Sequence, residues 1–446
     1  MPYTKNTWQD GHAGTGAGAL GGVANQGRLN HMETGIQDGY SSFLDVESGK
    51  FGTAGTWAAV EAACTEAQNS GGPSAVVYMG GKHYEADSTI EFTRPFTLLG
   101  GFGIRGTRIT HASGFTGFVF SGKEMKRDGE WEGSSGSEPT PIYDEADDDG
   151  GMTISGFSIV EDNRNTAGVN GIEFWDVDDL YMSNLQFGYL TGTALKLGAD
   201  DDEVGTVSGM AAGRVRESDF ERIRIYRCGD GSPDGTPDVP AFILQNGDHA
   251  TSDGTNQNFF SHFRFVYNEG RMLLRGGAGS SNSLRRTIFR DMQLHGLADN
   301  NNWVPEQWFP FDLVTLEGAV RETLFDGVTV NGNRAGTACW AMKAHPTDTG
   351  SGAQPKRLIL RNINAVNVHG DLVRVEEGDS VYLDGWGLGG VEQAIMRVNA
   401  NAGPDASPFK GSVNEMGYSA PAAGDFVVDN GSVRYSYHNE LLGTAT

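Results

Sequence analysis

Carboxylates near a repeated strand pattern are the first candidates for chemistry. Glu161, Asp162, Glu173 and Asp176 follow the strand-like segment Ile154–Ile159 closely. Hydrolysis of a glycosidic bond needs one protonated and one ionised carboxyl group, and lyase chemistry needs a base beside a neutralised uronate. Glu173 alternates with apolar neighbours, which predicts that it points outward. These four residues are therefore the predicted catalytic candidates, and a solvated acidic surface is the alternative.

A second group of residues is suited to binding sugars. Glu317 and Glu376 stand at or just after predicted strands, where they could extend a groove. Trp175, Trp303 and Trp308 lie in predicted corners or insertions, and aromatic rings stack on the apolar faces of sugars. We predict these five residues as glycan or receptor contacts. The alternatives are plain surface charge and aromatic side chains that pack their own loops.

The charge of the chain weakens every argument from a single acid. The 446 residues include 58 Asp and Glu against 33 Lys and Arg, a net charge of −25 and a pI near 4.7. Arg outnumbers Lys by 24 to 9. Abundant acids with few Lys favour a halophilic source, because salt screens the self-repulsion of an acidic surface. An ordinary acidic secreted or virion protein is the alternative. A nucleic-acid partner is disfavoured, since phosphates would be repelled.

No cofactor or metal site is predicted. Cys64, Cys228 and Cys339 are far apart and form no metal-binding pair, so we expect three buried thiols. The pattern G-x-G-x-x-G at Gly101–Gly106 is not followed by a helix, which a dinucleotide site needs. The acidic run Asp144–Asp149 lacks the terminal Glu of a calcium loop. No apolar run is long enough to insert in a membrane, and the start shows no signal peptide.

A six-residue repeat predicts the fold. Its pattern is apolar, any, small or polar, apolar, any, apolar, and the alternation indicates strands with a bend at the third position. Second short strands follow many copies. Such units bury their apolar faces only by stacking, so we predict an all-β solenoid, a parallel β-helix, over a β-sandwich or a propeller. The copies are Ile154–Ile159, Met182–Phe187, Phe220–Ile225, Phe260–Phe265, Phe289–Leu294, Phe325–Val330, Leu360–Ala365, Leu383–Leu388 and Val428–Val433.

Segments outside the repeat complete the predicted organisation. Residues 55–70 read as an amphipathic helix with Trp57, Val60 and Cys64 on one face. The short stretches 75–79 and 96–99 read as strands. The predicted divisions are a segment 1–42, a capping helix with the first coils 43–121, an acidic surface loop 122–151, the ladder 152–433 and a tail 434–446.

The N-terminal segment resembles a short module of phage tail and tail-fibre proteins. Thr7–Gly11 reads T-W-Q-D-G, and Leu29–Ile36 reads L-N-H-M-E-T-G-I. The module carries T-x-W-x-D-G followed by L-N-x-M-E-x-G-I, so one residue is missing here between Thr and Trp. The resemblance implies attachment to a virus particle and to other tail or baseplate proteins. The residues that would carry this attachment are Trp8, Leu29, Met32 and Ile36.

Residues 44–110 are similar to the entry of pectate-lyase-like right-handed parallel β-helices, including tailspikes. A helix precedes Ser74–Tyr84, a Gly-rich turn follows Phe96–Leu99, and Thr107–Thr110 closes the segment. Gly80 replaces the proline of the family pattern. Together the two resemblances imply a phage or archaeal-virus tail spike or tail fibre, located in the virion after synthesis in the host cytoplasm.

Three hypotheses follow from the resemblance. The first is a homotrimeric spike that recognises a host-surface glycan or glycoprotein. The second is a polysaccharide hydrolase or lyase on the same scaffold. The third is a structural baseplate or decoration protein that binds no receptor.

Overall fold

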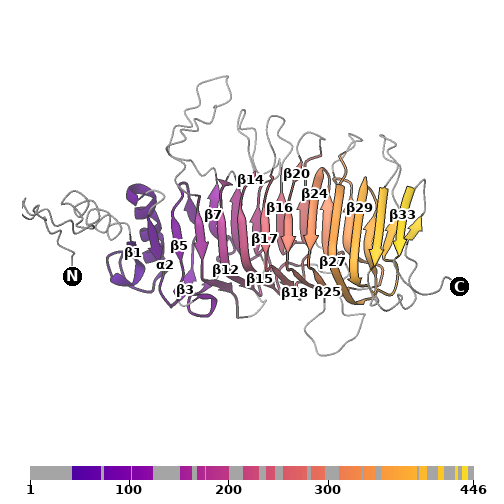
Figure 1. Cartoon of the computed structure of the whole chain (residues 1–446). Helices are drawn as coiled ribbons and strands as arrows, with labels where there is room; N and C mark the ends of the chain where they lie inside the picture. The colour runs from indigo at the N-terminus through magenta and orange to yellow at the C-terminus, as the bar shows by residue number, and fades with distance from the viewer. Residues whose placement is uncertain are drawn as a thin grey trace, which may run out of the picture.

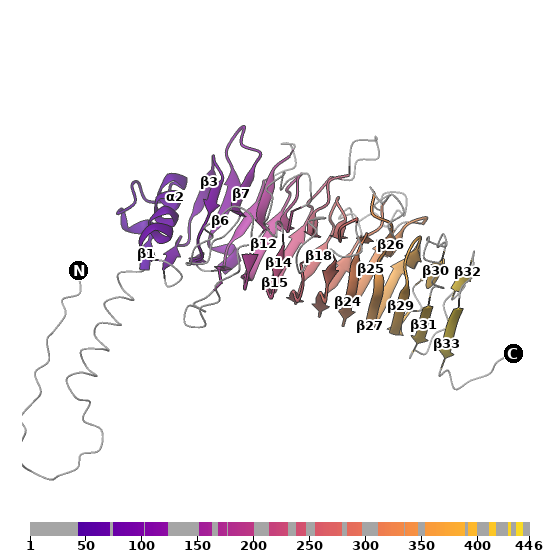
Figure 2. The ribbon, with the colours of Figure 1, turned by 90° about the horizontal axis from the view of Figure 1, so that it is seen from above.

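A computed structural model shows one elongated coil of short parallel strands, with the helix α2 (Trp57–Glu66) at its N-terminal end (Figures 1 and 2). The structure describes residues 43–71, 75–101, 103–123, 151–162, 168–175, 177–199, 214–230, 238–246, 255–278, 283–296, 311–333, 335–346, 353–388, 391–398, 410–415, 427–429 and 434–439. Trp8, Leu29, Met32 and Ile36, which are predicted to attach the protein to a virus particle, lie outside these ranges.

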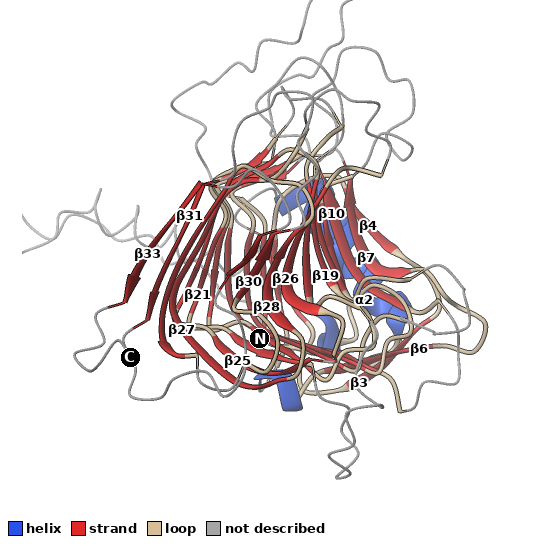
Figure 3. Ribbon diagram, turned by 90° about the vertical axis from the view of Figure 1, so that its right-hand side faces the viewer, coloured by secondary structure: helices blue, strands red, loops and turns tan. Residues whose placement is uncertain are grey.

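Two long parallel sheets form the coil, and the chain visits both once in most turns. Figure 3 shows them end-on as the walls of a closed cross-section. We name them sheet A and sheet B. Sheet B contains β4 (Ile90–Phe92), β7 (Phe118–Lys123), β10 (Asn170–Trp175), β13 (Leu195–Leu197), β16 (Phe242–Gln245), β19 (Met272–Arg275), β23 (Val314–Glu317), β26 (Ala338–Lys343), β28 (Asp371–Val375), β30 (Met396–Val398) and β32 (Val427–Asp429).

Sheet A is longer and bent. It contains β1 (Phe43–Asp45), β2 (Val76–Tyr78), β3 (His83–Ala86), β5 (Thr97–Leu99), β6 (Arg108–His111), β8 (Thr153–Ser155), β9 (Ser158–Val160), β12 (Tyr181–Gly188), β15 (Asp219–Tyr226), β17 (Phe259–Ser261), β18 (Arg264–Val266), β20 (Leu284–Arg285), β21 (Ile288–Arg290), β22 (Gln293–His295), β24 (Val320–Asp326), β25 (Thr329–Asn333), β27 (Lys356–Val368), β29 (Ser380–Gly387), β31 (Lys410–Glu415) and β33 (Arg434–Asn439). The pair β11 (Val177–Asp178) and β14 (Val215–Arg216) lies beside it.

The hexad repeat is the register of sheet A. The first residue of each copy from 154 to 383 pairs with the first residue of the next copy. Inside the coil, Phe220, Phe260, Phe289 and Phe325 stack face to face, with ring centroids 4.4 to 4.7 Å apart. The predicted parallel β-helix is therefore confirmed.

The bends of sheet A are three columns of residues with positive φ, five positions apart in each turn. The second column is the third hexad position, so the predicted bend there is confirmed, and a left-handed backbone turns each strand through a corner. The first column is Asp179, Glu217, Gln257, Arg286, Glu322 and Arg357; the second is Gly156, Asn184, Arg222, His262, Asp291, Gly327 and Asn362; the third is Tyr189, Arg227, Tyr267, Gly332 and Asn367.

The ninth predicted copy, Val428–Val433, is wrong. Its first residues belong to β32 of sheet B, where Val428 pairs with Arg397. The next hexad position in sheet A is Val413, which pairs with Leu383. The segment that begins at Val428 resembles the hexad because apolar and polar residues also alternate in the strands of sheet B. β33 also pairs with β31, so the ladder enters the segment that we assigned to the tail.

The helix prediction is confirmed at the N-terminal end of the coil. α2 (Trp57–Glu66) begins after Thr56, whose hydroxyl accepts a hydrogen bond from the backbone N–H of Ala59 at 3.3 Å, a capping contact. Trp57, Val60 and Cys64 are buried against the first coil. The remaining short helices are η1 (Val46–Ser48), η2 (Ala67–Gly71) and η4 (Gly103–Arg105). Cys228 and Cys339 are also buried, as predicted.

Candidate functional site

Glu161 and Asp162 tie one turn of the coil to the preceding one. Glu161 Oε1 lies 2.8 Å from both the backbone nitrogen and Nδ1 of His111. Asp162 Oδ1 accepts a hydrogen bond from Arg108 Nη2 at 2.6 Å. That hydrogen bond and the charge of Arg108 lower the pKa of the exposed Asp162 carboxyl. Both acids therefore lie at the end of β9 beside β6, on sheet A.

Glu173 belongs to the other sheet. Its neighbours Ile172 and Phe174 are core residues, so Glu173 faces the outer side of sheet B. It is nevertheless only 6 % exposed, and it accepts a hydrogen bond from Ser121 Oγ at 2.7 Å. Asp176 lies outside the described residues. Glu173 thus belongs to a different sheet from Glu161 and Asp162.

The predicted sugar contacts are also dispersed. Trp175 ends β10 and is 9 % exposed, so most of its ring is covered. Glu376 is partly exposed, with Oε1 3.9 Å from Lys343 Nζ. Glu317 is buried on the outer side of sheet B. Trp303 and Trp308 lie outside the described residues.

Glu317 leads to the densest group of charges in the described part of the chain. Four carboxylates and five cations adjoin one another on the outer side of sheet B, contributed by the strands and strand ends of consecutive turns. We call this group the sheet B charge cluster. It consists of Asp238, Arg271, Arg275, Asp312, Glu317, Lys343, Asp371, Arg374 and Arg397.

One part of the cluster joins two carboxylates through a single guanidinium group. Arg275 donates to Glu317 Oε2 through Nε at 3.0 Å and Nη2 at 2.9 Å. Arg271 Nη1 lies 3.5 Å from Glu317 Oε1, and Arg271 Nε lies 2.9 Å from Asp238 Oδ2. Asp238 and Glu317 therefore contact the same guanidinium group, that of Arg271. This shared contact keeps the two carboxyl groups close to each other.

The pKa of Asp238 is raised above its ordinary value. Burial raises the pKa of this carboxyl, and the nearby charge of Glu317 raises it further, while Arg271 and Lys343 act in the opposite direction. Its Oδ1 atom is buried and has no hydrogen-bond partner in the described structure. A carboxyl with raised pKa beside an ion-paired carboxylate is the electrostatic pattern of an acid and its partner.

The other part of the cluster is centred on Asp371, which is fully buried. Its Oδ2 accepts hydrogen bonds from Arg374 at 2.9 and 3.1 Å and from Arg397 Nε at 2.8 Å. Asp312 joins it, since Arg374 Nη1 lies 3.8 Å from Asp312 Oδ1 and Lys343 Nζ lies 2.7 Å from Asp312 Oδ2. Buried charges are tolerated only when they are paired in this way.

Strand register explains why these charges meet. Arg275, Glu317 and Lys343 end three consecutive sheet B strands and pair with one another. Arg374 and Arg397 pair with each other on β28 and β30, the next two strands of sheet B. An apolar strand that ends in a charged residue is visible in the sequence. Of the nine cluster residues, however, only Glu317 was predicted as a site residue. Asp238, Asp312 and Asp371 stand before or at the start of strands and carried no comparable signal.

The described residues contain neither a metal-binding cluster nor a membrane-spanning helix. No group of three or more His, Cys, Asp or Glu side chains there is arranged to hold a metal ion. No helix in the same part of the chain is long and apolar enough to cross a membrane.

Comparison with known proteins shows the fold. No protein-family model and no curated protein matches the sequence. Among solved structures, the surface protein and adhesin PfbA of Streptococcus pneumoniae superposes with a TM-score of 0.53 at 11 % identity, covering 88 % of this chain and 99 % of that one. The chain therefore has a parallel β-helix fold that solved proteins share.

Two viral proteins are also similar in structure. ORF18 of Geobacillus virus E2 has a TM-score of 0.49 at 13 % identity over 92 % of this chain. The enzymatically active domain of bacteriophage CBA120 tailspike protein 2 has a TM-score of 0.47 at 9 % identity over 80 % of this chain. The chain spans 63 % and 45 % of their lengths, less than two thirds of either protein.

Proposed function

We propose that this protein is a virion tail spike or tail fibre that binds a glycan or glycoprotein on the host surface through the sheet B charge cluster. The observation that carries the proposal is the cluster itself, in which buried carboxylates and partly exposed guanidinium groups lie on the outer side of a β-helix wall. The tail-like residues of segment 1–42 support a place in the virion.

The cluster suits sugar recognition in physical terms. Guanidinium groups donate and carboxylates accept, which matches the mixed hydrogen-bonding capacity of sugar hydroxyls. Mutual ion pairs hold these groups in place before a ligand arrives, so little side-chain entropy is lost on binding. Trp303 and Trp308 precede Asp312 by only a few residues in the chain. We propose both, on the sequence alone, as further glycan contacts.

Glycan binding by a cluster variant tests this proposal. Arg397→Gln keeps Asp371 paired with Arg374, so the coil is expected to fold. Binding to purified host-envelope glycans should weaken about tenfold, the value of a charge-assisted hydrogen bond. The matched control is Arg361→Gln, an exposed charge on β27 of sheet A. Equal binding by the two variants would contradict the proposed site, and absence of glycan binding by the wild type would favour a purely structural baseplate or decoration role.

A polysaccharide depolymerase is the second candidate, favoured by Asp238, Arg271 and Glu317. Asp238 would protonate the leaving oxygen, because burial favours its protonated form. Glu317, ion-paired with Arg275, would act as base or nucleophile. The shared contact with Arg271 limits the distance between the two carboxyl groups, and hydrolases use separations of roughly 5 to 9.5 Å.

Product analysis separates binding from cleavage. If the protein is a hydrolase, host glycans should gain reducing ends, and Asp238→Asn and Glu317→Gln should each slow this at least about 100-fold. Unsaturated ends would indicate a lyase. Binding without new ends in the wild type would exclude the depolymerase proposal and leave the receptor-binding one intact.

We further propose that residues 1–42 attach the protein to other tail or baseplate proteins. Trp8, Leu29, Met32 and Ile36 are apolar side chains of this segment. Deletion of residues 1–42 should abolish incorporation into particles, as measured by particle proteomics. The β-helix of the shortened protein should still fold, as measured by circular dichroism. Incorporation of the truncated protein would contradict the attachment role.

Self-association, which we propose as a homotrimer, has its own support on sheet A. Exposed apolar stripes mark contact surfaces, and one outward position carries apolar side chains in most turns of the coil. Substituting Ile288 by Glu should lower the oligomeric state in sedimentation velocity, and an unchanged state would exclude this stripe. The stripe consists of Tyr181, Phe259, Ile288, Leu324, Ile359 and Tyr382.

A further inference from the structure

Lys343 places its amine against a buried carboxyl group on the outer side of sheet B. Lys343 Nζ lies 2.7 Å from Asp312 Oδ2, and the Asp312 side chain is only 7 % exposed against 28 % for that of Lys343. Lys82 pairs with Glu47 at a similar distance of 2.8 Å, but the Lys82 side chain is 52 % exposed. Of these two close pairs, only the one at Lys343 is largely shielded from water.

Strand pairing holds the amine and the carboxyl group in place. Asp312 lies two residues before β23, and Lys343 ends β26, the neighbouring strand of sheet B. The backbone N–H of Leu313 donates to Ala338 O at 3.0 Å, so the ladder between the two strands continues almost to Asp312. The Lys343 side chain therefore extends back along β26 to reach the carboxyl group. A nucleophile and an electrophile that a scaffold holds in contact react far faster than the same groups in solution.

Positive groups face the other oxygen of Asp312. The backbone N–H of Ala338 donates to Asp312 Oδ1 at 2.7 Å, and Arg374 Nη1 lies 3.8 Å from the same atom. Arg374 is itself held by Asp371, whose Oδ2 lies 2.9 Å from Arg374 Nη2. Donors fixed beside a carbonyl oxygen stabilise the negative charge that develops there when a nucleophile attacks the carbon. Asp312 Oδ1 therefore lies in an oxyanion-type environment, while Oδ2 faces the amine.

A second carboxylate lies beside the amine. Glu376 Oε1 is 3.9 Å from Lys343 Nζ, and the Glu376 side chain is 44 % exposed, so it has room to move. One bridging water molecule or a side-chain rotation brings such a group within reach of a proton on Nζ. Glu376 is therefore placed to accept a proton from the amine and to pass it to a leaving oxygen.

We propose that Lys343 and Asp312 join in an isopeptide bond, an amide between two side chains, and that the ion pair in the structure is its reactant. A proton of Lys343 Nζ first passes to Asp312 Oδ2, which leaves a neutral amine and a neutral acid. Nζ then bonds to Cγ of Asp312, Glu376 carries one proton from Nζ to Oδ2, and the Cγ–Oδ2 bond breaks as one water molecule leaves. The bond consumes no co-reactant and needs no glycan, so this inference goes beyond the proposed function.

Mass spectrometry of the full-length protein tests the proposal. After several days in the folded state, the denatured chain should be lighter than its sequence mass by one water molecule. Protease digestion should yield the peptide of Asp312 joined to that of Lys343, whereas Lys82 and Glu47, the matched exposed pair, should stay unlinked. An unchanged mass would overturn the proposal and show an ordinary ion pair. Loss of water from a peptide that is not joined to another would overturn it as well.

Two variants assign the roles in the reaction. Lys343→Arg keeps a cation beside Asp312 but has no primary amine, so it should retain its full sequence mass. Glu376→Gln leaves the reacting pair intact and should slow bond formation about 100-fold, followed as mass against time in freshly purified protein. Bond formation at the wild-type rate in Glu376→Gln would overturn the role of Glu376. A wild-type chain of full mass that binds glycans would overturn the bond alone, and a linked chain that binds none would overturn the proposed function alone.

Discussion

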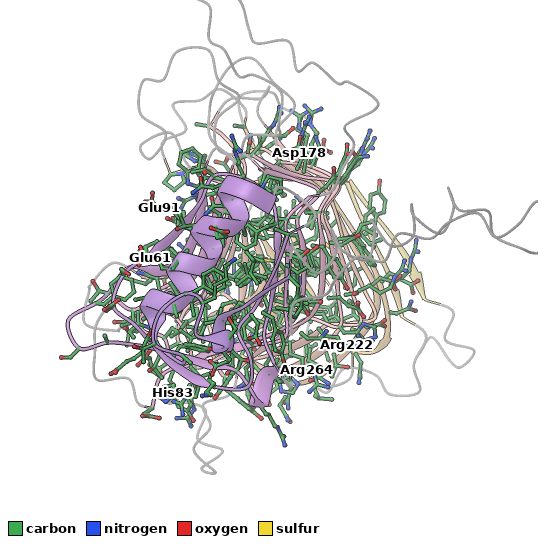
Figure 4. All side chains as sticks on the ribbon, turned by 90° about the vertical axis from the view of Figure 1, so that its left-hand side faces the viewer. Glu61, His83, Glu91, Asp178, Arg222 and Arg264 are labelled. Carbon is green, nitrogen blue, oxygen red and sulfur yellow. The ribbon has the colours of Figure 1, made fainter. Side chains whose placement is uncertain are left out.

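Arg222 occupies the third hexad position, where all other turns of the second column except the one with His262 have Gly, Asn or Asp. Its φ is 54°, and its side chain lies on the outside of the molecule (Figure 4). An L-residue in this conformation brings Cβ close to its own carbonyl, at a cost of about 1 to 2 kcal/mol. Asn184 and Asn362 lie in the same column, and asparagine adopts a positive φ at a lower free-energy cost than arginine does.

Replacing Arg222 by Asn should therefore stabilise the protein. The gain is about 0.5 to 1 kcal/mol, because relief of backbone strain exceeds the small value of the exposed ion pair with Glu221. Differential scanning calorimetry would show a higher transition temperature. Arg361→Asn, at an exposed position without positive φ, is the control and should give no increase. A lower transition temperature for Arg222→Asn would refute the strain explanation.

Asp238 makes stability depend on pH in a predictable direction. Its folded-state pKa is raised by burial, so the folded protein binds this proton more tightly than the unfolded chain does. The resulting stabilisation is complete below the ordinary pKa of an aspartate, and it is lost as pH rises through the folded-state value. Urea unfolding of the wild type minus that of Asp238→Asn, followed from pH 3 to 7, should decrease with pH. A difference that increases with pH would show that Arg271 dominates the pKa.

At the scale of elements, the hexad strands could be predicted from sequence and the charge cluster could not. Alternating apolar residues such as Phe260, Phe263 and Phe265 mark a strand and its inner face locally. Asp238 and Glu317 are far apart in the chain, and they meet because strands of different turns pair in one register. Loops of unequal length separate those turns, so no local pattern carries that register. The bends at Arg222 and His262 were also hard to predict, because neither residue type is typical of a backbone with positive φ.

The phenylalanine stack should behave as a local unit. Phe260 lies between Phe220 and Phe289, with ring centroids at 4.4 and 4.6 Å. Phe260→Ala should destabilise these turns by about 3 to 5 kcal/mol, because the neighbours cannot close the cavity. Hydrogen exchange should therefore accelerate in β15, β17 and β21, since a coil contacts only its neighbours. Phe260→Leu is the milder control, and uniform acceleration along the whole chain would contradict a local unit.

For the whole molecule, the net charge of −25 predicts stabilisation by salt. The Debye length falls from about 10 Å at 0.1 M to about 3 Å at 1 M, which screens repulsion among surface acids. The transition temperature at pH 7 should therefore rise over this range of NaCl. The control is the same series at pH 4.7, near the pI, where the effect should be much smaller. An equal rise at both pH values would show that salt acts by another route, and the proposed halophilic adaptation would lose its support.

The corner columns have a consequence for how such a protein can evolve. Each column keeps a fixed backbone shape while its side chains vary, as the exchange of Tyr267 for Gly332 and Asn367 along one column shows. The residues that close the core are different positions of the same strands. Mutation can therefore rewrite the outer surface one turn at a time without disturbing the interior. Ligand preference would depend on the outer side chains and folding on the inner ones, so the two properties can change separately during evolution.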